Sequence, residues 1–121
     1  MSKLKVRNIT KGTLLADGAG IADTSSKRKT GLLKHPRLEA GDGLWITPCE
    51  AVHTIGMKFA IDVLFLDKKR RVLKVRHAMP RWRISGSLFA HSVLELPSGT
   101  AEATRTAAGD QLEFEKYEAA G

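Results

Sequence analysis

Four side chains able to take part in chemistry stand just before the most apolar segment of the chain. They are Cys49, His53, Thr54 and Met57, and the segment that follows, residues 59–66, reads FAIDVLFL around one acid, Asp62. Thiol, imidazole and carboxyl groups are those with which proteins transfer protons, attack carbonyl groups and bind metals. Polar groups held where an apolar strand begins commonly shape a pocket, so this region is the candidate site.

The spacing of these residues does not predict a metal site. Cys49 and His53 are four residues apart, and His77 and His91 are scattered further along the chain. Zinc sites are usually marked by closely paired ligands such as Cys-x-x-Cys, and no such pair occurs here. Dinucleotide and phosphate-loop motifs are also missing from the sequence, so we expect neither a metal nor a cofactor.

Enzymatic activity stays open, because no recognisable catalytic motif marks the chain. The Gly-x-Ser-x-Gly motif of serine hydrolases does not occur. Cys49 would act as a nucleophile only with His53 beside its thiolate, and a lone cysteine serves equally well as a small buried hydrophobic residue. His53 and Asp62 are the candidates for general acid and base, and a two-carboxylate hydrolase would need Asp62 and Glu95 to meet in space.

The segment around Asp62 has the pattern of a strand buried on both faces. Phe59, Ile61, Val63 and Phe65 alternate along one face, and Asp62 shares the other face with the apolar residues 60, 64 and 66. A carboxylate on such a face must find a partner or give up its charge. We therefore expect Asp62 to be buried, ionised and paired.

Arg28 is the expected partner of Asp62. It lies one helical turn before Leu32 on the same face of a helix predicted over residues 25–33, and its planar guanidinium suits a carboxylate. His53 and Thr54 are the alternative partners. The pocket predicted from the sequence is lined by six residues, namely Arg28, Cys49, His53, Thr54, Met57 and Asp62.

The formal net charge is +7, and much of the excess lies in a stretch without acids. Its basic residues are Lys68, Lys69, Arg70, Arg71, Lys74, Arg76, Arg81 and Arg83. We expect residues 68–71 to form a solvated hairpin turn of little value to stability. Trp82 is expected to cover the sheet while Arg81 and Arg83 face water. The alternative is a nucleic-acid or anion-binding surface on which Trp82 stacks against bases.

Turn residues divide the chain into short strands and little helix. Strands are expected at residues 3–9, 13–16, 21–23, 43–47, 59–67, 72–75, 91–96 and 112–114, and helices at residues 25–33 and 100–108. A turn is expected at Asp17-Gly18, and Trp45 is expected in the core. The pattern predicts an α+β fold of mostly antiparallel β-sheet with one or two short helices, for which barrel-like closure is one arrangement.

Length and composition indicate one domain over residues 1–121. The first residues lack the apolar core of a signal peptide, and no apolar run reaches the ~20 residues that cross a bilayer. Cys49 is the only cysteine, as is typical of a reducing compartment. We expect a cytoplasmic protein that has no membrane partner.

A series of motifs resembles the family called domain of unknown function 192 (DUF-192). The series comprises Arg28-x-x-Gly31-Leu32-Leu33, Gly43-Leu44, Cys49, His53-Thr54-Ile55-Gly56-Met57, Ile61-Asp62, Phe65-Leu66-Asp67, Val72, Pro80, Leu94-Glu95-Leu96-Pro97, Gly99 and Gly109-Asp110, and it covers nearly the whole chain after about Ile21. Two segments depart from the family, since Lys34-His35 replaces a frequent arginine and residues 68–71 replace a turn that usually contains glycine. The resemblance implies a compact, sheet-rich domain and implies no reaction.

The leading interpretation is a small domain with a pocket, around residues 53–62, for a small ligand or a protein partner. The first alternative is a nucleic-acid- or anion-binding module that uses the stretch from Lys68 to Arg83. The second alternative is an enzyme in which His53 and Asp62 act as acid and base.

Overall fold

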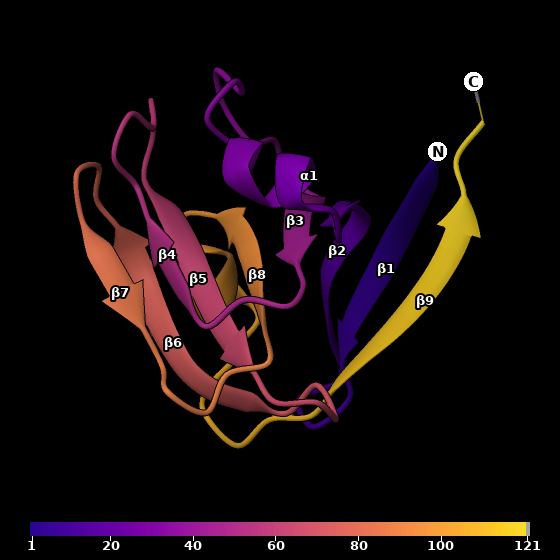
Figure 1. The fold of residues 1–121 in the computed structure, drawn as a ribbon. Coiled ribbons are helices and arrows are strands. Elements are labelled where there is room, and N and C mark those ends of the chain that lie inside the picture. Colours follow the sequence, from indigo (N-terminus) through magenta and orange to yellow (C-terminus); the bar gives the residue numbers. More distant parts are fainter. Residues whose placement is uncertain (121) are drawn as a thin grey trace.

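The fold is built from short strands and two short helices, as a computed structural model that describes residues 1–120 shows (Figure 1). The elements are β1 (Ser2–Asn8), β2 (Thr13–Ala22), α1 (Ser25–Thr30), β3 (Asp42–Ile46), β4 (Ala51–His53), β5 (Ile61–Leu66), β6 (Val72–Met79), β7 (Ile84–Gly86), β8 (Ser92–Pro97), α2 (Thr100–Ala103) and β9 (Leu112–Glu118). Seven strands form one sheet in the order β6-β5-β8-β3-β2-β1-β9, and β4 pairs with β7. The described pairs are antiparallel except β2–β3, which confirms the α+β, mostly antiparallel fold.

The large sheet curls toward a barrel but, among the described strands, its edges meet at one end only. There Arg71 and Gln111 form an isolated bridge, and the Val72 amide donates to the Asp110 carbonyl over 2.8 Å. Toward the other end the two halves of the sheet diverge, and α1 lies between them (Figure 1). The sheet is therefore barrel-like without being a closed barrel.

β5 is buried along its whole length, as its two apolar faces predict. Ile61, Val63 and Phe65 belong to one core cluster, and Leu64 and Leu66 belong to a second. The first cluster includes the buried leucine just after α1, and the second includes the buried alanine of α2. We call these two sides of the sheet the α1 face and the α2 face.

Asp62 lies on the α2 face, fully buried, and its partners are backbone amides. The Ala78 amide donates to one carboxyl oxygen over 2.7 Å, and the amides of Gly99 and Ala101 donate to the other over 3.1 and 2.8 Å. The expectation of a buried, partnered acid is confirmed, whereas pairing with Arg28 is wrong. Three amide donors satisfy a carboxylate without any cation, and they tie the end of β6 to the segment that starts α2.

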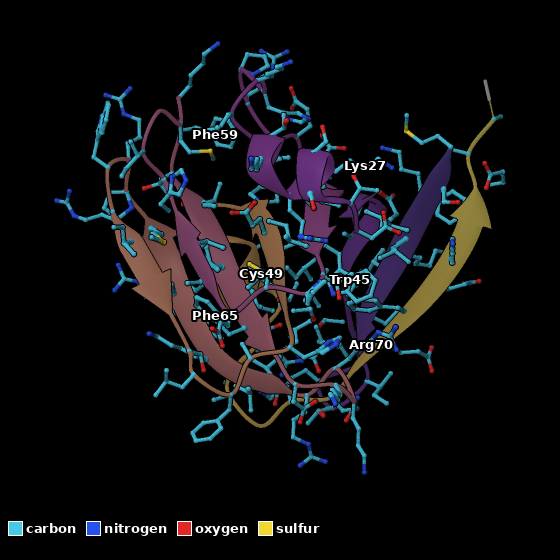
Figure 2. All side chains as sticks on the ribbon, in the orientation of Figure 1. Lys27, Trp45, Cys49, Phe59, Phe65 and Arg70 are labelled. Carbon is cyan, nitrogen blue, oxygen red and sulfur yellow. The ribbon has the colours of Figure 1, made fainter. Side chains whose placement is uncertain are left out.

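The turn between β5 and β6 is only partly the solvated hairpin expected from its charge. Three of its four basic residues are exposed, but Arg70 is half-buried. Its guanidinium carbon lies 5.3 Å from the centre of the Trp45 ring and 4.7 Å from that of Phe114, and Figure 2 shows Arg70 beside Trp45. The exposure predicted for Arg70 is therefore wrong, whereas Trp45 packs against the core as expected, edge to face with Phe114 at 5.1 Å.

Several local features differ from the expectations, among them the helix expected over residues 100–108, which ends at Ala103. The turn at Asp17-Gly18 does not form, because β2 continues through both residues while it changes its partner from β1 to β3. The helix expected over residues 25–33 ends at Thr30, where Gly31 with a φ of 48° caps it. Strands β4 and β7 do not follow from the sequence, because three residues are too few to reveal an alternating pattern.

Candidate functional site

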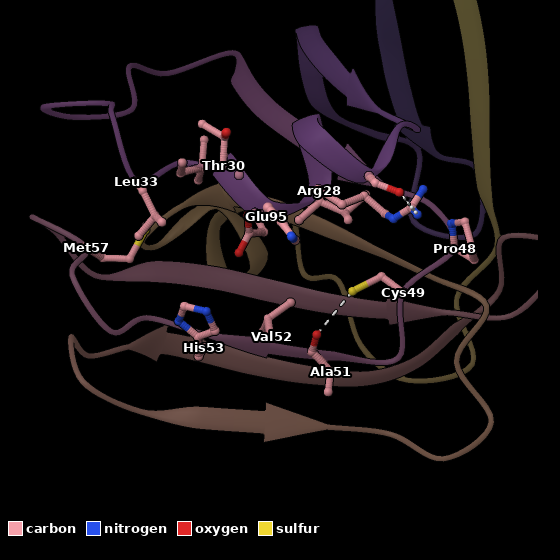
Figure 3. A pocket seen from close by; sticks show the side chains of 15 residues that line it. Arg28, Thr30, Leu33, Pro48, Cys49, Ala51, Val52, His53, Met57 and Glu95 are labelled. Atoms are coloured by element: carbon pink, nitrogen blue, oxygen red, sulfur yellow. Dashed lines mark hydrogen bonds between the residues drawn. The ribbon is translucent and has the colours of Figure 1, made fainter.

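A cavity of about 410 Å³ lies on the α1 face of the sheet (Figure 3). Its walls come from α1 and the residues after it, from the end of β3, from β4 and from β8. The lining residues are Ser25, Arg28, Lys29, Thr30, Gly31, Leu32, Leu33, Ile46, Pro48, Cys49, Ala51, Val52, His53, Met57 and Glu95. This volume and this mixture of apolar wall with a few ionisable groups are typical of small-molecule sites.

α1 places Arg28 at the edge of this cavity. The Thr24 side chain caps the helix by accepting from the Lys27 amide over 3.2 Å. Arg28 Nη1 then donates to the carbonyl oxygens of Asp23 and Thr47, over 3.2 and 3.4 Å. Arg28 Nη2 also donates to the Ser25 hydroxyl over 3.4 Å, and in Figure 3 the guanidinium extends away from the carboxyl group of Glu95.

Cys49 is half-buried in the same cavity. Its thiol donates to the Ala51 carbonyl oxygen, 3.1 Å from Sγ (Figure 3). Burial raises the pKa of the Cys49 thiol above its ordinary value. A thiol that stays protonated is a poor nucleophile, so this geometry does not favour Cys49 as a catalytic residue.

Glu95 is the acidic cavity residue that sequence reasoning left out of the pocket. It stands in β8 opposite Val63 of β5 and Leu44 of β3, and only 4% of it is exposed. Among the described residues no donor bonds to its carboxyl group, and burial raises the pKa of Glu95 to about 7. The signal in the sequence is an acid inside the apolar strand SVLELP, the same pattern that singled out Asp62.

Asp62 and Glu95 lie on opposite faces of the sheet. In the β5–β8 pair Asp62 stands opposite Leu96 and Glu95 stands opposite Val63, and residues opposite each other share a face. Asp62 therefore faces α2 while Glu95 faces the cavity. The two acids do not form a two-carboxylate site, and the structure does not bring Asp62 together with His53, which lines the cavity.

Four of the six predicted pocket residues line the cavity, namely Arg28, Cys49, His53 and Met57. Thr54 is instead fully buried and serves the backbone. Its hydroxyl donates to the Pro80 carbonyl over 2.6 Å and accepts from the Arg83 amide over 2.9 Å. Thr54 thereby fastens the end of β4 to the turn before β7, and Asp62 fastens the α2 face.

The basic stretch covers both ends of one hairpin and the strand between them, where Lys74 and Arg76 are half-buried. Lys68 and Lys69 lie at the turn of the β5–β6 hairpin, whereas Arg81 and Arg83 follow its other end. Strands of this length rise ~3.3 Å per residue, which separates the two groups by about 20 Å. Trp82 is 61% exposed, so the expectation that it covers the sheet is wrong.

Across residues 1–120, no group of three or more histidine, cysteine, aspartate or glutamate side chains gathers closely enough to hold a metal ion. The absence of a functional metal stays a prediction that chelation tests. In the same part of the chain, none of the helices has the length and apolar character to cross a membrane.

Comparison with known proteins confirms the resemblance seen in the sequence. Residues 6–114 match the model of the DUF192 family, described as "Uncharacterized ACR, COG1430". A UPF0127 protein of Thermococcus sibiricus is 33% identical over 120 residues, which cover 92% of this chain and 75% of that protein.

Two solved structures share the fold. A protein of unknown function from Novosphingobium aromaticivorans superposes with a TM-score of 0.78 at 20% identity, covering 91% of this chain and 82% of that one. A Sinorhizobium meliloti protein described as "a putative transcription regulator" superposes with a TM-score of 0.82 at 19% identity, covering 94% of each chain. At these identities the likeness concerns the fold alone.

Proposed function

The chain belongs to the DUF192 family, whose description names no activity, and we propose from the cavity itself that the protein binds a small ligand between α1, β4 and β8. The observation that carries this proposal is the carboxyl group of Glu95, which is buried on the cavity wall and has no hydrogen-bond partner among the described residues. A buried polar group without a partner costs free energy, and a ligand that bonds to it removes this cost.

The apolar wall supports a ligand with an apolar body. Leu33, Val52 and Met57 line the cavity, and Val52 and Met57 belong to the buried cluster of the α1 face. Contact with these side chains would remove apolar surface from water on both sides. A cytoplasmic location is part of the proposal, and the single cysteine of the chain supports it.

Cys49 supplies a built-in reporter for the test, because it is the only cysteine and lines the cavity. A fragment library is screened for compounds that slow alkylation of Cys49 by iodoacetamide, measured by mass spectrometry. Leu33→Trp, which puts an indole into the cavity, should abolish this protection. Leu88→Ala is the control, because Leu88 is 87% exposed and does not line the cavity. Unchanged protection in Leu33→Trp would show that binding occurs elsewhere.

A second candidate function is single-stranded nucleic-acid binding at the turn before β7. The specific observation in its favour is Trp82, which stands 61% exposed between two exposed arginines, Arg81 and Arg83. An exposed indole stacks on bases, and flanking guanidinium groups contact phosphates.

Salt titration with a fluorescent poly-dT oligonucleotide tests this second function. Affinity should fall steadily as salt increases, since phosphate contacts release counterions. Trp82→Ala should weaken binding by roughly 5- to 100-fold through lost stacking, whereas Lys69→Ala, at the other end of the hairpin, should have a much smaller effect. Binding that ignores both salt and Trp82 would rule this surface out.

A further inference from the structure

The chemistry of the cavity is set by the acid Glu95, which has no donor from the described chain, and by the groups that face the cavity. Arg28 and Lys29 face the cavity from α1, Cys49 from the connection after β3, and His53 from β4. None of these four bonds to the carboxyl group of Glu95 in the described chain. The inner wall of the cavity therefore ends in a hydrogen-bond acceptor that lacks a donor.

The cations at the cavity do not take this role. The guanidinium of Arg28 is held by the carbonyl oxygens of Asp23 and Thr47, on the side of the cavity near Pro48 (Figure 3). Lys29 is exposed to solvent. Thr30 and His53 also line the cavity, and neither bonds to the acid in the described chain, which leaves room for a donor that arrives with a ligand.

We propose, resting on the ligand site proposed above, that the pocket takes a small molecule with a cationic nitrogen head on an apolar body, and that this nitrogen donates to Glu95. An ionised carboxyl group only accepts hydrogen bonds, and an ammonium group only donates them. Their pairing gives charge-assisted bonds where water is excluded. A carboxylate-headed ligand would meet Glu95 as a like charge and would need it protonated.

The protonation of Glu95 predicts how the affinity for a cationic ligand should change with pH. Because burial raises the pKa of Glu95 to about 7, the free pocket holds a proton at pH 5.5 and is mostly ionised at pH 8. An ammonium group must displace that proton at the lower pH. Its affinity should therefore be about 30-fold weaker at pH 5.5 than at pH 8, whereas a neutral head should show no such change.

The test uses the full chain labelled with ¹³C at its methionine methyl groups, with three probes titrated at both pH values. The probes are phenethylamine, 2-phenylethanol and 3-phenylpropanoate, which share an apolar body and differ in the head group. The Met57 methyl signal reports on the cavity, and Met79, which is fully buried and does not line it, is the internal control. The expected result is that phenethylamine shifts the Met57 methyl signal, and that the shift saturates at an about 30-fold lower phenethylamine concentration at pH 8 than at pH 5.5.

Two variants locate the effect. Glu95→Gln should weaken phenethylamine binding at pH 8 by on the order of 10- to 100-fold and remove its pH dependence. His53→Gln should keep the pH dependence, which excludes the cavity imidazole as its source. The pH series on the unmodified protein tests the proposal independently of how either variant folds.

The contrary outcomes separate the two proposals. Equal phenethylamine affinity at both pH values, or tighter binding of 3-phenylpropanoate, overturns the cationic head group while the cavity remains a ligand site. If none of the three probes shifts the Met57 methyl signal, the ligand site itself is overturned along with the head group.

Discussion

Asp62 and Glu95 sit in neighbouring strands, one residue pair apart, yet within residues 1–120 only the carboxyl group of Asp62 has hydrogen-bond partners. Two of its three donors have an irregular backbone, namely Ala78 with a φ of 45° and Gly99 with a φ of 95°. No backbone amide of the described chain donates to the carboxyl group of Glu95. We therefore assign a structural role to Asp62 and propose ligand binding for Glu95.

Asp62→Ala should lower the free energy of unfolding by roughly 3–5 kcal/mol, because three amides lose their acceptor at once, one of them buried and two partly buried. Arg28→Ala should cost less than about 1 kcal/mol, since this side chain makes only long hydrogen bonds, to two carbonyl oxygens and the Ser25 hydroxyl, at the edge of the cavity. Urea denaturation of both variants measures the difference. Similar losses in the two variants would mean that Arg28 supports Asp62 after all.

Among the elements, the β5–β6 hairpin contains a half-buried arginine, Arg70, that packs against aromatic side chains. The sequence predicts that the turn containing Arg70 is exposed to solvent, but the guanidinium of Arg70 lies over the Trp45 and Phe114 rings. Arg70→Ala should therefore cost about 1 kcal/mol of unfolding free energy. Lys69→Ala, exposed in the same turn, is the matched control and should change it by less than about 0.5 kcal/mol. Thermal unfolding of the two variants compares them, and equal melting temperatures would contradict a stabilising role for the stacked guanidinium.

α1 is an element held by its ends, because none of its six residues is buried. Its N-terminus depends on the Thr24 side chain, which accepts from the Lys27 amide. Thr24→Ala should cost about 1 kcal/mol and loosen the helix that roofs the cavity. Alkylation of Cys49 should then accelerate relative to Ser26→Ala, an exposed helix position that provides the control. A rate unchanged by Thr24→Ala would show that α1 does not limit access.

The elements with regular patterns could be predicted, and those fixed by distant contacts could not. β5 follows from the alternation of its apolar residues, and the start of α1 at Ser25 agrees with the helix predicted from residue 25. β4 and β7 exist only because they pair with each other across more than thirty residues of chain, which no local pattern reveals. The same limit applies to the cavity. Four of its residues are predicted from their types, whereas Glu95 faces the cavity because the strand register places it opposite Val63, which no local pattern reveals.

At the scale of the whole molecule, two buried acids should give stability opposite slopes with pH. Burial works to raise the pKa of Asp110, but bonds from Asn8, the Ala107 amide and Lys11 outweigh it and hold that pKa below its ordinary value. Asp110 therefore contributes stability that is present at neutral pH and is lost in acid, as the pH falls through its folded pKa.

Glu95 acts in the other direction. Burial raises its pKa from 4.5 to about 7, so the folded state holds a proton that the unfolded chain releases above pH 4.5. The stabilisation is complete below that pH and is lost as the pH rises to 7, by about 3 kcal/mol in all. Stability should therefore peak near pH 5, and urea denaturation at pH 5 and pH 8 should show the drop. Glu95→Gln should remove the loss of stability between pH 5 and pH 8 and leave the loss in acid, which Asp110 causes, unchanged. If the free energy of unfolding of Glu95→Gln falls by the same amount between pH 5 and pH 8, the titrating group is another residue. Glu95 would then be ionised in the folded protein across this pH range.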